Sequence, residues 1–145
     1  MNVEATIERV LDGQDYRPSE DEPFMCDRQK NYFRKKLIDW KTSIIEESRE
    51  TLSNMQESCC NIPDLADRAS AETDRALELR TRDRQRKLIA KIDAALRRLE
   101  DGSYGFCEVT GEPISLKRLD ARPIATLSLE AQEMHERREK VHRDA

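Results

Sequence analysis

The sequence predicts an all-α protein that consists of a long antiparallel coiled-coil hairpin, a small globular base and a C-terminal helix. Charged residues make up 39% of the 145 residues and aromatic residues 5%, a balance typical of long solvated helices with one narrow apolar stripe. Apolar residues also recur at steps of three and four along two long segments. The short segment around Pro63 that joins them is long enough only to reverse the chain, which predicts a hairpin.

The first arm of the hairpin follows an N-terminal segment, residues 1–24, which we expect to be partly flexible. This segment contains Gly13, Pro18 and Pro23 together with a cluster of acids, and these residues end any short helix. From Met25 the helical pattern continues without Gly or Pro up to Pro63. The predicted inward stripe of this arm is Phe33, Leu37, Trp40, Ile44, Ser48, Leu52, Met55 and Cys59.

The second arm begins just past Pro63, because the missing N–H of a proline needs no partner in the first turn of a helix. It ends at Gly102, so the hairpin comprises residues 25–101 with its tip near 61–69. A parallel coiled-coil dimer kinked at Pro63 would bury the same stripes and stays open as an alternative. The predicted stripe of the second arm is Leu65, Ala69, Glu72, Ala76, Leu79, Ile89, Ile92, Leu96 and Leu99.

Residues 102–127 are expected to form the globular base, with turns at "TGEP" and "ARP". Ser128 is placed to cap a C-terminal helix over 128–145, with Glu130 in its first turn. Without a metal, apolar side chains must hold the base together. The expected set is Phe106, Ile114, Leu116, Leu119, Ile124, Leu127, Leu129 and Met134.

The base contains two pairs of positions at the spacing of a zinc knuckle. Cys107 and Thr110 stand three apart, as do Ser128 and Ala131. A structural zinc site needs four donors, usually thiolates or imidazoles, and one cysteine, two hydroxyls and a methyl group do not supply them. His135, one helical turn after Ala131, would still leave two ligands missing. We therefore predict a degenerate knuckle that binds no zinc.

The charge balance and the histidines exclude several classes of function. The net charge of -4 comes from 30 acids and 26 bases that are closely interspersed, which argues against DNA binding as the main activity. No apolar run reaches the length of a membrane span, so we expect a cytoplasmic protein, in which the cysteines stay reduced. We also expect the protein to be a monomer. Neither histidine lies in a nucleophile or metal constellation, so we do not expect an enzyme.

Two groups of charged residues in the hairpin are candidates for binding. Asp64 and Asp67 stand near a helix start, where they could either approach a basic or magnesium-bearing site or serve as caps that complement the helix dipole. Arg80, Arg84, Lys87 and Lys91 recur at steps of four, three and four, which places them on one face of the second arm. Alternatively, that face is solvated and paired with Glu78, Asp83 and other nearby acids.

Three segments resemble the DksA group of the DksA/TraR family of bacterial transcription factors. They are "DRAS" at the tip, "LELRTRDRQRKLIAKI" on the second arm and the pattern CxxxGExIxLKRLxARPxA in the base. The resemblance extends from about Phe33 to Lys140. It implies a factor that enters the secondary channel of RNA polymerase and places its tip near the active site, without contacting DNA. With ppGpp, such factors destabilise open complexes, repress ribosomal RNA promoters and favour amino-acid biosynthesis promoters.

The resemblance also implies roles for particular residues. The tip residues are Asp64, Asp67 and Ala69, and the basic face contacts the polymerase. The ppGpp pocket, shared with the polymerase rim, falls on Leu88, Lys91, Arg122 and Gln132. Gln132 stands where the family pattern usually has a lysine, and the degenerate knuckle is similar to that of zinc-independent members. No permanently bound cofactor is expected.

Two other functions remain as alternatives. A Gre-like transcript cleavage factor would use tip acids to position a second magnesium ion and a water. The compact base with knuckle spacing favours the DksA type over this class. A coiled-coil scaffold without a polymerase role is the other alternative, and its tip aspartates would be dispensable.

Overall fold

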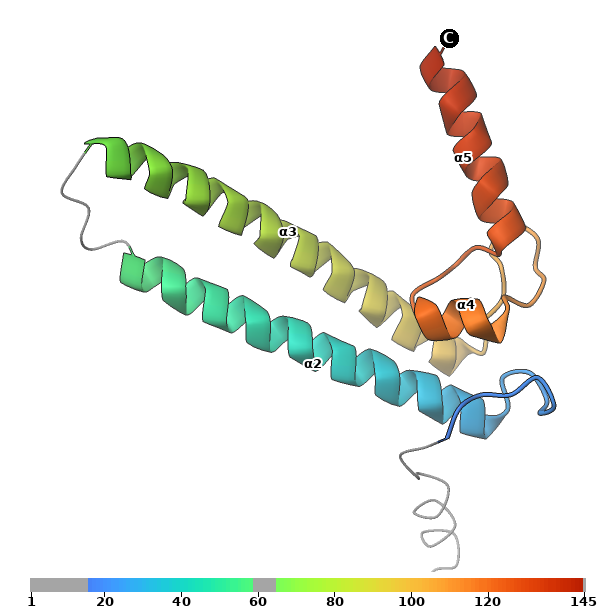
Figure 1. The fold of residues 1–145 in the computed structure, drawn as a ribbon. Helices are drawn as coiled ribbons and strands as arrows, with labels where there is room; N and C mark the ends of the chain where they lie inside the picture. Colours follow the sequence, from blue (N-terminus) through green and yellow to red (C-terminus); the bar gives the residue numbers. More distant parts are fainter. Residues whose placement is uncertain (1–15, 59–64, 145) are drawn as a thin grey trace, which may run out of the picture. The chain divides into compact units, whose positions relative to one another are not determined.

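The computed structural model describes residues 16–58 and 65–144, and in this part of the chain the protein is helical (Figure 1). The helices are α2 (Asp27–Ser58), α3 (Leu65–Asp101), α4 (Leu116–Ala121) and α5 (Leu129–Asp144). The β structure of the described residues is one isolated antiparallel bridge between Phe106 and Pro113. The predicted all-α architecture of hairpin, base and C-terminal helix is confirmed.

The chain divides into two compact units. The hairpin unit is Ile38–Ala94, and the described residues of the base unit are 16–37 and 95–144. Helices α2 and α3 each contribute to both units, and in the hairpin unit they run antiparallel (Figure 1). None of the helices over the described ranges has a stretch long and apolar enough to cross a membrane.

The base-proximal part of the hairpin unit has the predicted apolar seam, the row of positions where α2 and α3 face each other. Ile44 on α2 and Ile92 on α3 are buried. The ammonium group of Lys41 lies 2.6 Å from the carboxylate of Asp93, joining the two helices beside this seam. The predicted stripe is therefore confirmed at Ile44 and Ile92.

Toward the tip the seam becomes polar, and here the predicted stripe of α3 is wrong. Ala69, Glu72, Ala76 and Leu79 are all exposed. The prediction connected Leu79 directly to Ile89, and ten residues make roughly 2.8 helical turns, so the two side chains cannot share a face. On α2, Leu52 is also exposed. The partly buried seam positions of α3 are instead Ala71, Glu78, Arg82 and Gln85.

The core of the protein lies in the base unit, where both hairpin helices meet the compact segment after α3. The Phe33 and Tyr104 ring centroids are 5.6 Å apart, and the Tyr104 hydroxyl donates to the carbonyl oxygen of Pro123 at 2.7 Å. Burial raises the pKa of Tyr104 well above its ordinary value. In this unit the side chains with at most 3% exposure are the polar Gln29 and the less polar Phe33, Leu37, Ala95, Leu99, Tyr104, Cys107, Ile114 and Leu119.

The predicted core of the base is only partly correct. Ile114, Leu116, Leu119 and Ile124 are buried as predicted, and Leu127 is partly buried. Phe106, Leu129 and Met134 are exposed, so the prediction is wrong for these three residues. Within α5 the buried residue is Ala131, so this helix contacts the base through its first turn and leaves its larger apolar side chains outside.

Short-range hydrogen bonds fix the ends of the base helices. The hydroxyl oxygen of Ser128 accepts a bond from the N–H of Ala131 at 3.3 Å, which confirms the predicted cap of α5. Helix α3 ends at Asp101 and is followed by Gly102 at φ 80°, as predicted. Gly105 has a φ of 86°, and a Cβ there would lie 3.0 Å from the Met25 side chain, so a larger residue would not fit.

A charged contact joins α4 to α2. The Asp120 carboxylate accepts hydrogen bonds from the Lys36 ammonium group at 2.6 Å and from the Tyr32 hydroxyl at 2.7 Å. These two bonds, that of Lys36 first, hold the pKa of Asp120 below its usual range. The base is therefore held in place by both apolar packing and this polar contact.

Candidate functional site

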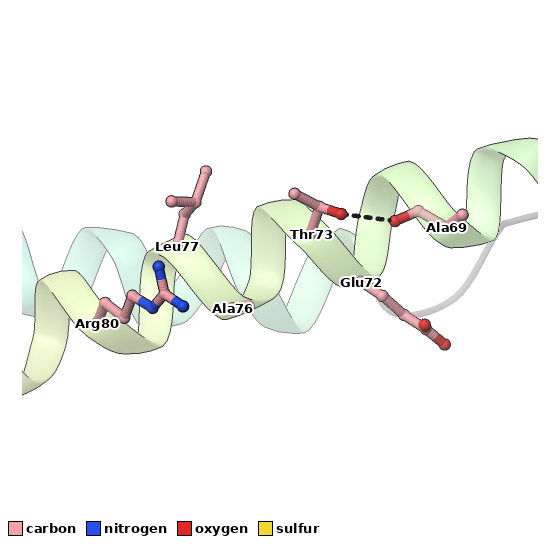
Figure 2. Close-up of a pocket in the computed structure, with 6 residues that line it drawn as sticks. All are labelled: Ala69, Glu72, Thr73, Ala76, Leu77 and Arg80. Atoms are coloured by element: carbon pink, nitrogen blue, oxygen red, sulfur yellow. Dashed lines mark hydrogen bonds between the residues drawn. The ribbon is translucent and has the colours of Figure 1, made fainter.

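The tip-proximal end of α3 exposes a carboxylate and a small side chain. Helix α3 begins at Leu65, and Asp67 lies in its first turn with its side chain exposed. The Asp67 side chain makes no hydrogen bond or ion pair with any described residue. Ala69 is exposed, and its carbonyl oxygen accepts a bond from the Thr73 hydroxyl at 3.0 Å (Figure 2). Asp64 and the segment 61–64 of the predicted tip lie outside the described residues.

The four residues of the predicted basic face are all exposed on one side of α3. Arg80, Arg84, Lys87 and Lys91 belong to the hairpin unit. None of their side chains forms an ion pair or a hydrogen bond with a described residue. The pairing with Glu78 and Asp83 that the alternative required is therefore not formed within the described part of the chain. These side chains are available to bind a negatively charged partner.

The positions predicted to bind ppGpp belong to two different units. Leu88 is partly buried and Lys91 is exposed in the hairpin unit, whereas Arg122 and Gln132 belong to the base unit. Arg122 is exposed at the C-cap of α4, where its N–H donates to Arg118 at 2.8 Å. The Gln132 amide donates to the carboxylate of Glu136 at 2.9 Å.

The degenerate knuckle is organised around the sulfur of Cys107. Cys107 and Ala131 are 3% and 4% exposed. The Thr110 hydroxyl and the N–H groups of Ser128, Thr110 and Val109 lie near the Cys107 sulfur and favour its charged form. The structure therefore brings together three of the four predicted knuckle positions, Cys107, Thr110 and Ser128.

The pKa of Cys107 reflects this arrangement. Burial is the largest influence and raises the pKa, but the hydrogen bonds from Thr110 and from the three N–H groups together outweigh it and lower the pKa to about 6. Hydrogen bonds to the charged form of a group favour that form. The thiolate of Cys107 is therefore the favoured form near neutral pH.

The residues of the knuckle do not fit a zinc ion. A closed zinc site takes four thiolate or imidazole donors, and this one offers one thiolate, two hydroxyls that remain protonated and the methyl group of Ala131. No cluster of three or more His, Cys, Asp or Glu residues that could hold a metal occurs in the described ranges 16–58 and 65–144. His135 lies beside Glu139 at 3.6 Å on the exposed side of α5, as expected for a solvated residue.

Sequence reasoning missed the exposed side chain of Leu77. It is 54% exposed and lies beside Arg80 on α3 (Figure 2). The spacing could have indicated this, because Leu77 stands three residues before Arg80, which is almost one helical turn. The predicted stripe of this arm left Leu77 out, and no role was predicted for it.

The fold and the site together define a helical-hairpin protein with a compact base whose knuckle positions offer one thiolate instead of the four donors of a zinc site. The family model described as DnaK suppressor protein DksA, N-terminal domain, matches residues 29–99. The one described as prokaryotic dksA/traR C4-type zinc finger matches residues 102–137.

Individual relatives agree with these matches. A protein from Caulobacter vibrioides is 71% identical over 135 residues, which cover 93% of this chain and 95% of that protein. One from Haemophilus influenzae is 44% identical over 125 residues, 86% of each chain. Both are named RNA polymerase-binding transcription factor DksA. The structure of transcription factor DksA2 from Pseudomonas aeruginosa matches with a TM-score of 0.77 and 36% identity, over 92% of this chain and 98% of that one. The chain belongs to the DksA family.

Proposed function

We propose that this chain is a transcription factor that binds RNA polymerase through the secondary channel and regulates initiation from there. Its membership of the DksA family and the names of its relatives support this proposal. The observation that carries it is that Asp67 in the first turn of α3 is exposed, that four bases lie along the same helix, and that none of these five side chains is paired with a described residue.

In this proposal the tip of the hairpin acts near the polymerase active site. Asp64 and Asp67 provide negative charge beside a catalytic centre that contains magnesium and basic residues, and Ala69 keeps the adjacent surface small. Bound in this way, the factor destabilises open complexes, represses ribosomal RNA promoters and favours amino-acid biosynthesis promoters. It acts on the polymerase and has no catalytic activity of its own.

The alarmone ppGpp is proposed as the co-regulator at the interface with the polymerase rim. Lys91 and Arg122 are both exposed cations that can donate charge-assisted hydrogen bonds to phosphates. Leu88 and Gln132 complete the proposed contact. Because Gln132 is neutral and already bonded to Glu136, it gives a weaker phosphate contact than a lysine would.

The base is proposed to function as a monomeric, zinc-free module in the cytoplasm. The zinc-free part of this proposal is supported by the donor set of the knuckle, one thiolate with two hydroxyls and a methyl group, which does not fit zinc.

The test is transcription in vitro from a ribosomal RNA promoter, with and without ppGpp. Asp67→Asn should keep polymerase binding, because the arms and the base are unchanged, and should lose most of the inhibition. Asp74→Asn is the matched control, since Asp74 is an exposed acid two turns further along α3, and it should inhibit like the wild type. Equal inhibition by Asp67→Asn and wild type would remove the tip from the mechanism, and rapid shortening of RNA in backtracked complexes would point to a cleavage factor instead.

A further inference from the structure

Helix α4 has only six residues, so its shape depends on contacts outside it. A helix this short forms too few internal hydrogen bonds to offset the cost of nucleation, and the last carbonyl groups of any helix lack partners within it. In α4 the carbonyl of Arg118 accepts the N–H of Arg122 at 2.8 Å. The carbonyl of Asp120 accepts instead from the Lys36 ammonium group of α2 at 2.6 Å. Lys36 therefore caps the C-terminal end of α4, where the helix dipole favours a cation.

The same ammonium group also holds the side chain of Asp120. The Asp120 carboxylate accepts hydrogen bonds from Lys36 at 2.6 Å and from the Tyr32 hydroxyl at 2.7 Å. The Tyr32 ring makes edge contacts with the rings of Tyr16 and Phe33, at centroid distances of 5.9 and 5.2 Å. Asp120 is thus held through its main chain and its side chain by two residues that stand one turn apart on α2. We call Tyr32, Lys36 and Asp120 the α4 anchor.

Arg122 follows the α4 anchor directly and combines a fixed backbone with an exposed side chain. Its carbonyl accepts the N–H of Ala125 at 3.0 Å, and residues 123–125 are buried. The Arg122 guanidinium makes no hydrogen bond or ion pair with a described residue. The nearest acid along the chain is Asp120, whose carboxylate is already bonded within the α4 anchor. The backbone of Arg122 is therefore held on both sides while its charge stays available to an anion.

We propose that Tyr32, Lys36 and Asp120 are positioning residues that hold Arg122 where its guanidinium binds the phosphates of ppGpp. This inference rests on the proposed function, from which it takes the ligand. Fixing a binding group in advance lowers the entropy cost of binding. Of the two base-unit residues in the proposed contact, Gln132 is neutral and Arg122 carries the charge, so the placement of Arg122 affects the affinity more.

Inhibition of a ribosomal RNA promoter by the full chain, titrated with ppGpp, tests the α4 anchor. Lys36→Gln and Asp120→Asn should each raise the ppGpp concentration for half-maximal effect by about three- to fivefold, the scale expected when one long side chain is no longer preorganised. Lys41→Gln is the matched control, because Lys41 pairs with Asp93 at the same 2.6 Å and has a similar side-chain exposure, 33% against 35% for Lys36. It should respond to ppGpp like the wild type. Inhibition without ppGpp should be unchanged in all three variants.

The signs of the two substitutions separate positioning from a simple charge effect. Lys36→Gln removes a positive charge and Asp120→Asn a negative one, so a charge effect on the anionic ligand would weaken the response in the first variant and strengthen it in the second. Loss of positioning weakens it in both. Tyr32→Phe, which removes one hydroxyl and keeps the ring, should act in the same direction by less. Since the α4 anchor acts through Arg122, Asp120→Asn should have no further effect in an Arg122→Ala background.

Several results would overturn the proposal. They are a stronger ppGpp response in Asp120→Asn, an unchanged response in both Lys36→Gln and Asp120→Asn, and a full effect of Asp120→Asn in the Arg122→Ala background. An equal loss of inhibition with and without ppGpp would also overturn it, by assigning the α4 anchor to the stability of the base. A wild type that inhibits transcription without responding to ppGpp would refute the proposed ppGpp contact and the positioning role together, whereas a normal response shared by wild type and variants would refute the positioning role alone.

Discussion

Replacing Cys107 with alanine should remove a pH-dependent contribution to the stability of the base. The Thr110 hydroxyl and the N–H groups of Ser128, Thr110 and Val109 lie near the Cys107 sulfur and favour its charged form. Alanine leaves these donors without their acceptor beneath the turn at 108–111. Donors that lose a charged acceptor lose the stabilisation that it gave them, so the folded state is destabilised.

The size and sign of the effect follow from the two pKa values. The folded-state pKa of Cys107 is about 6, below the ordinary value of 9.0. Because the folded pKa is depressed, the contribution is complete above pH 9 and is lost as the pH falls through 6. Ideal linkage for one such group gives about 2 kcal/mol between pH 6 and pH 8. Since the neighbouring turn is exposed and water competes for its donors, we expect about half of this.

Urea denaturation at pH 6, 7 and 8 under reducing conditions measures the effect. Wild type should gain about 1 kcal/mol of unfolding free energy over this range relative to Cys107→Ala. Cys26→Ala, which changes another free cysteine of the base unit, should keep the pH dependence of wild type. Two results would refute the stabilised thiolate. One is an identical pH dependence of the unfolding free energy in wild type and Cys107→Ala. The other is a thiolate absorbance of Cys107, present in wild type and missing from the variant, that appears only near pH 9.

Three further predictions concern the hairpin, the ppGpp contact and metal. Gln85→Leu should raise the free energy of unfolding by about 1 kcal/mol, because the Gln85 side-chain oxygen is buried without a hydrogen-bond partner. The control Gln56→Leu, at an exposed position of α2, should leave it unchanged. Equal urea midpoints for Gln85→Leu and wild type would contradict this prediction. Gln132→Lys should tighten ppGpp binding to the polymerase complex by about two- to fivefold, as for a charged contact near the surface, and unchanged affinity would separate Gln132 from the phosphate contact. Metal analysis of the purified protein should find no stoichiometric zinc, and a chelator should leave its helicity and unfolding midpoint unchanged; stoichiometric zinc or chelator-induced unfolding of the base would end the zinc-free interpretation.

The sequence predicted the elements of this fold because their signals are local. Gly102 ends α3 and Ser128 caps α5 through contacts within a few residues. The seam of the distal hairpin was mispredicted because Leu79, although apolar, lies on an exposed side of α3 and not on the side that faces α2. Phe106 and Met134 were mispredicted for a related reason, since the burial of an apolar residue depends on which side of its element meets the base. The hydrogen bonds to Cys107 could not be predicted, because three of their donors are backbone groups that carry no residue signal.

The residues that stabilise the fold and the residues that are proposed to act on the polymerase lie in different parts of this chain. Among the residues whose burial the structure describes, the buried apolar side chains of the hairpin unit are Ile44 and Ile92, and the others belong to the base unit. The distal seam contains Glu78, Arg82 and Gln85 in place of leucines, so it contributes little apolar burial, and the exposed basic face of α3 contributes none. Substitutions on that face can therefore change binding with little effect on folding, whereas the knuckle affects binding only through the fold. It follows that Cys107→Ala should lose activity only at temperatures or pH values at which its base unfolds, while Asp67→Asn should be inactive under conditions in which it is fully folded.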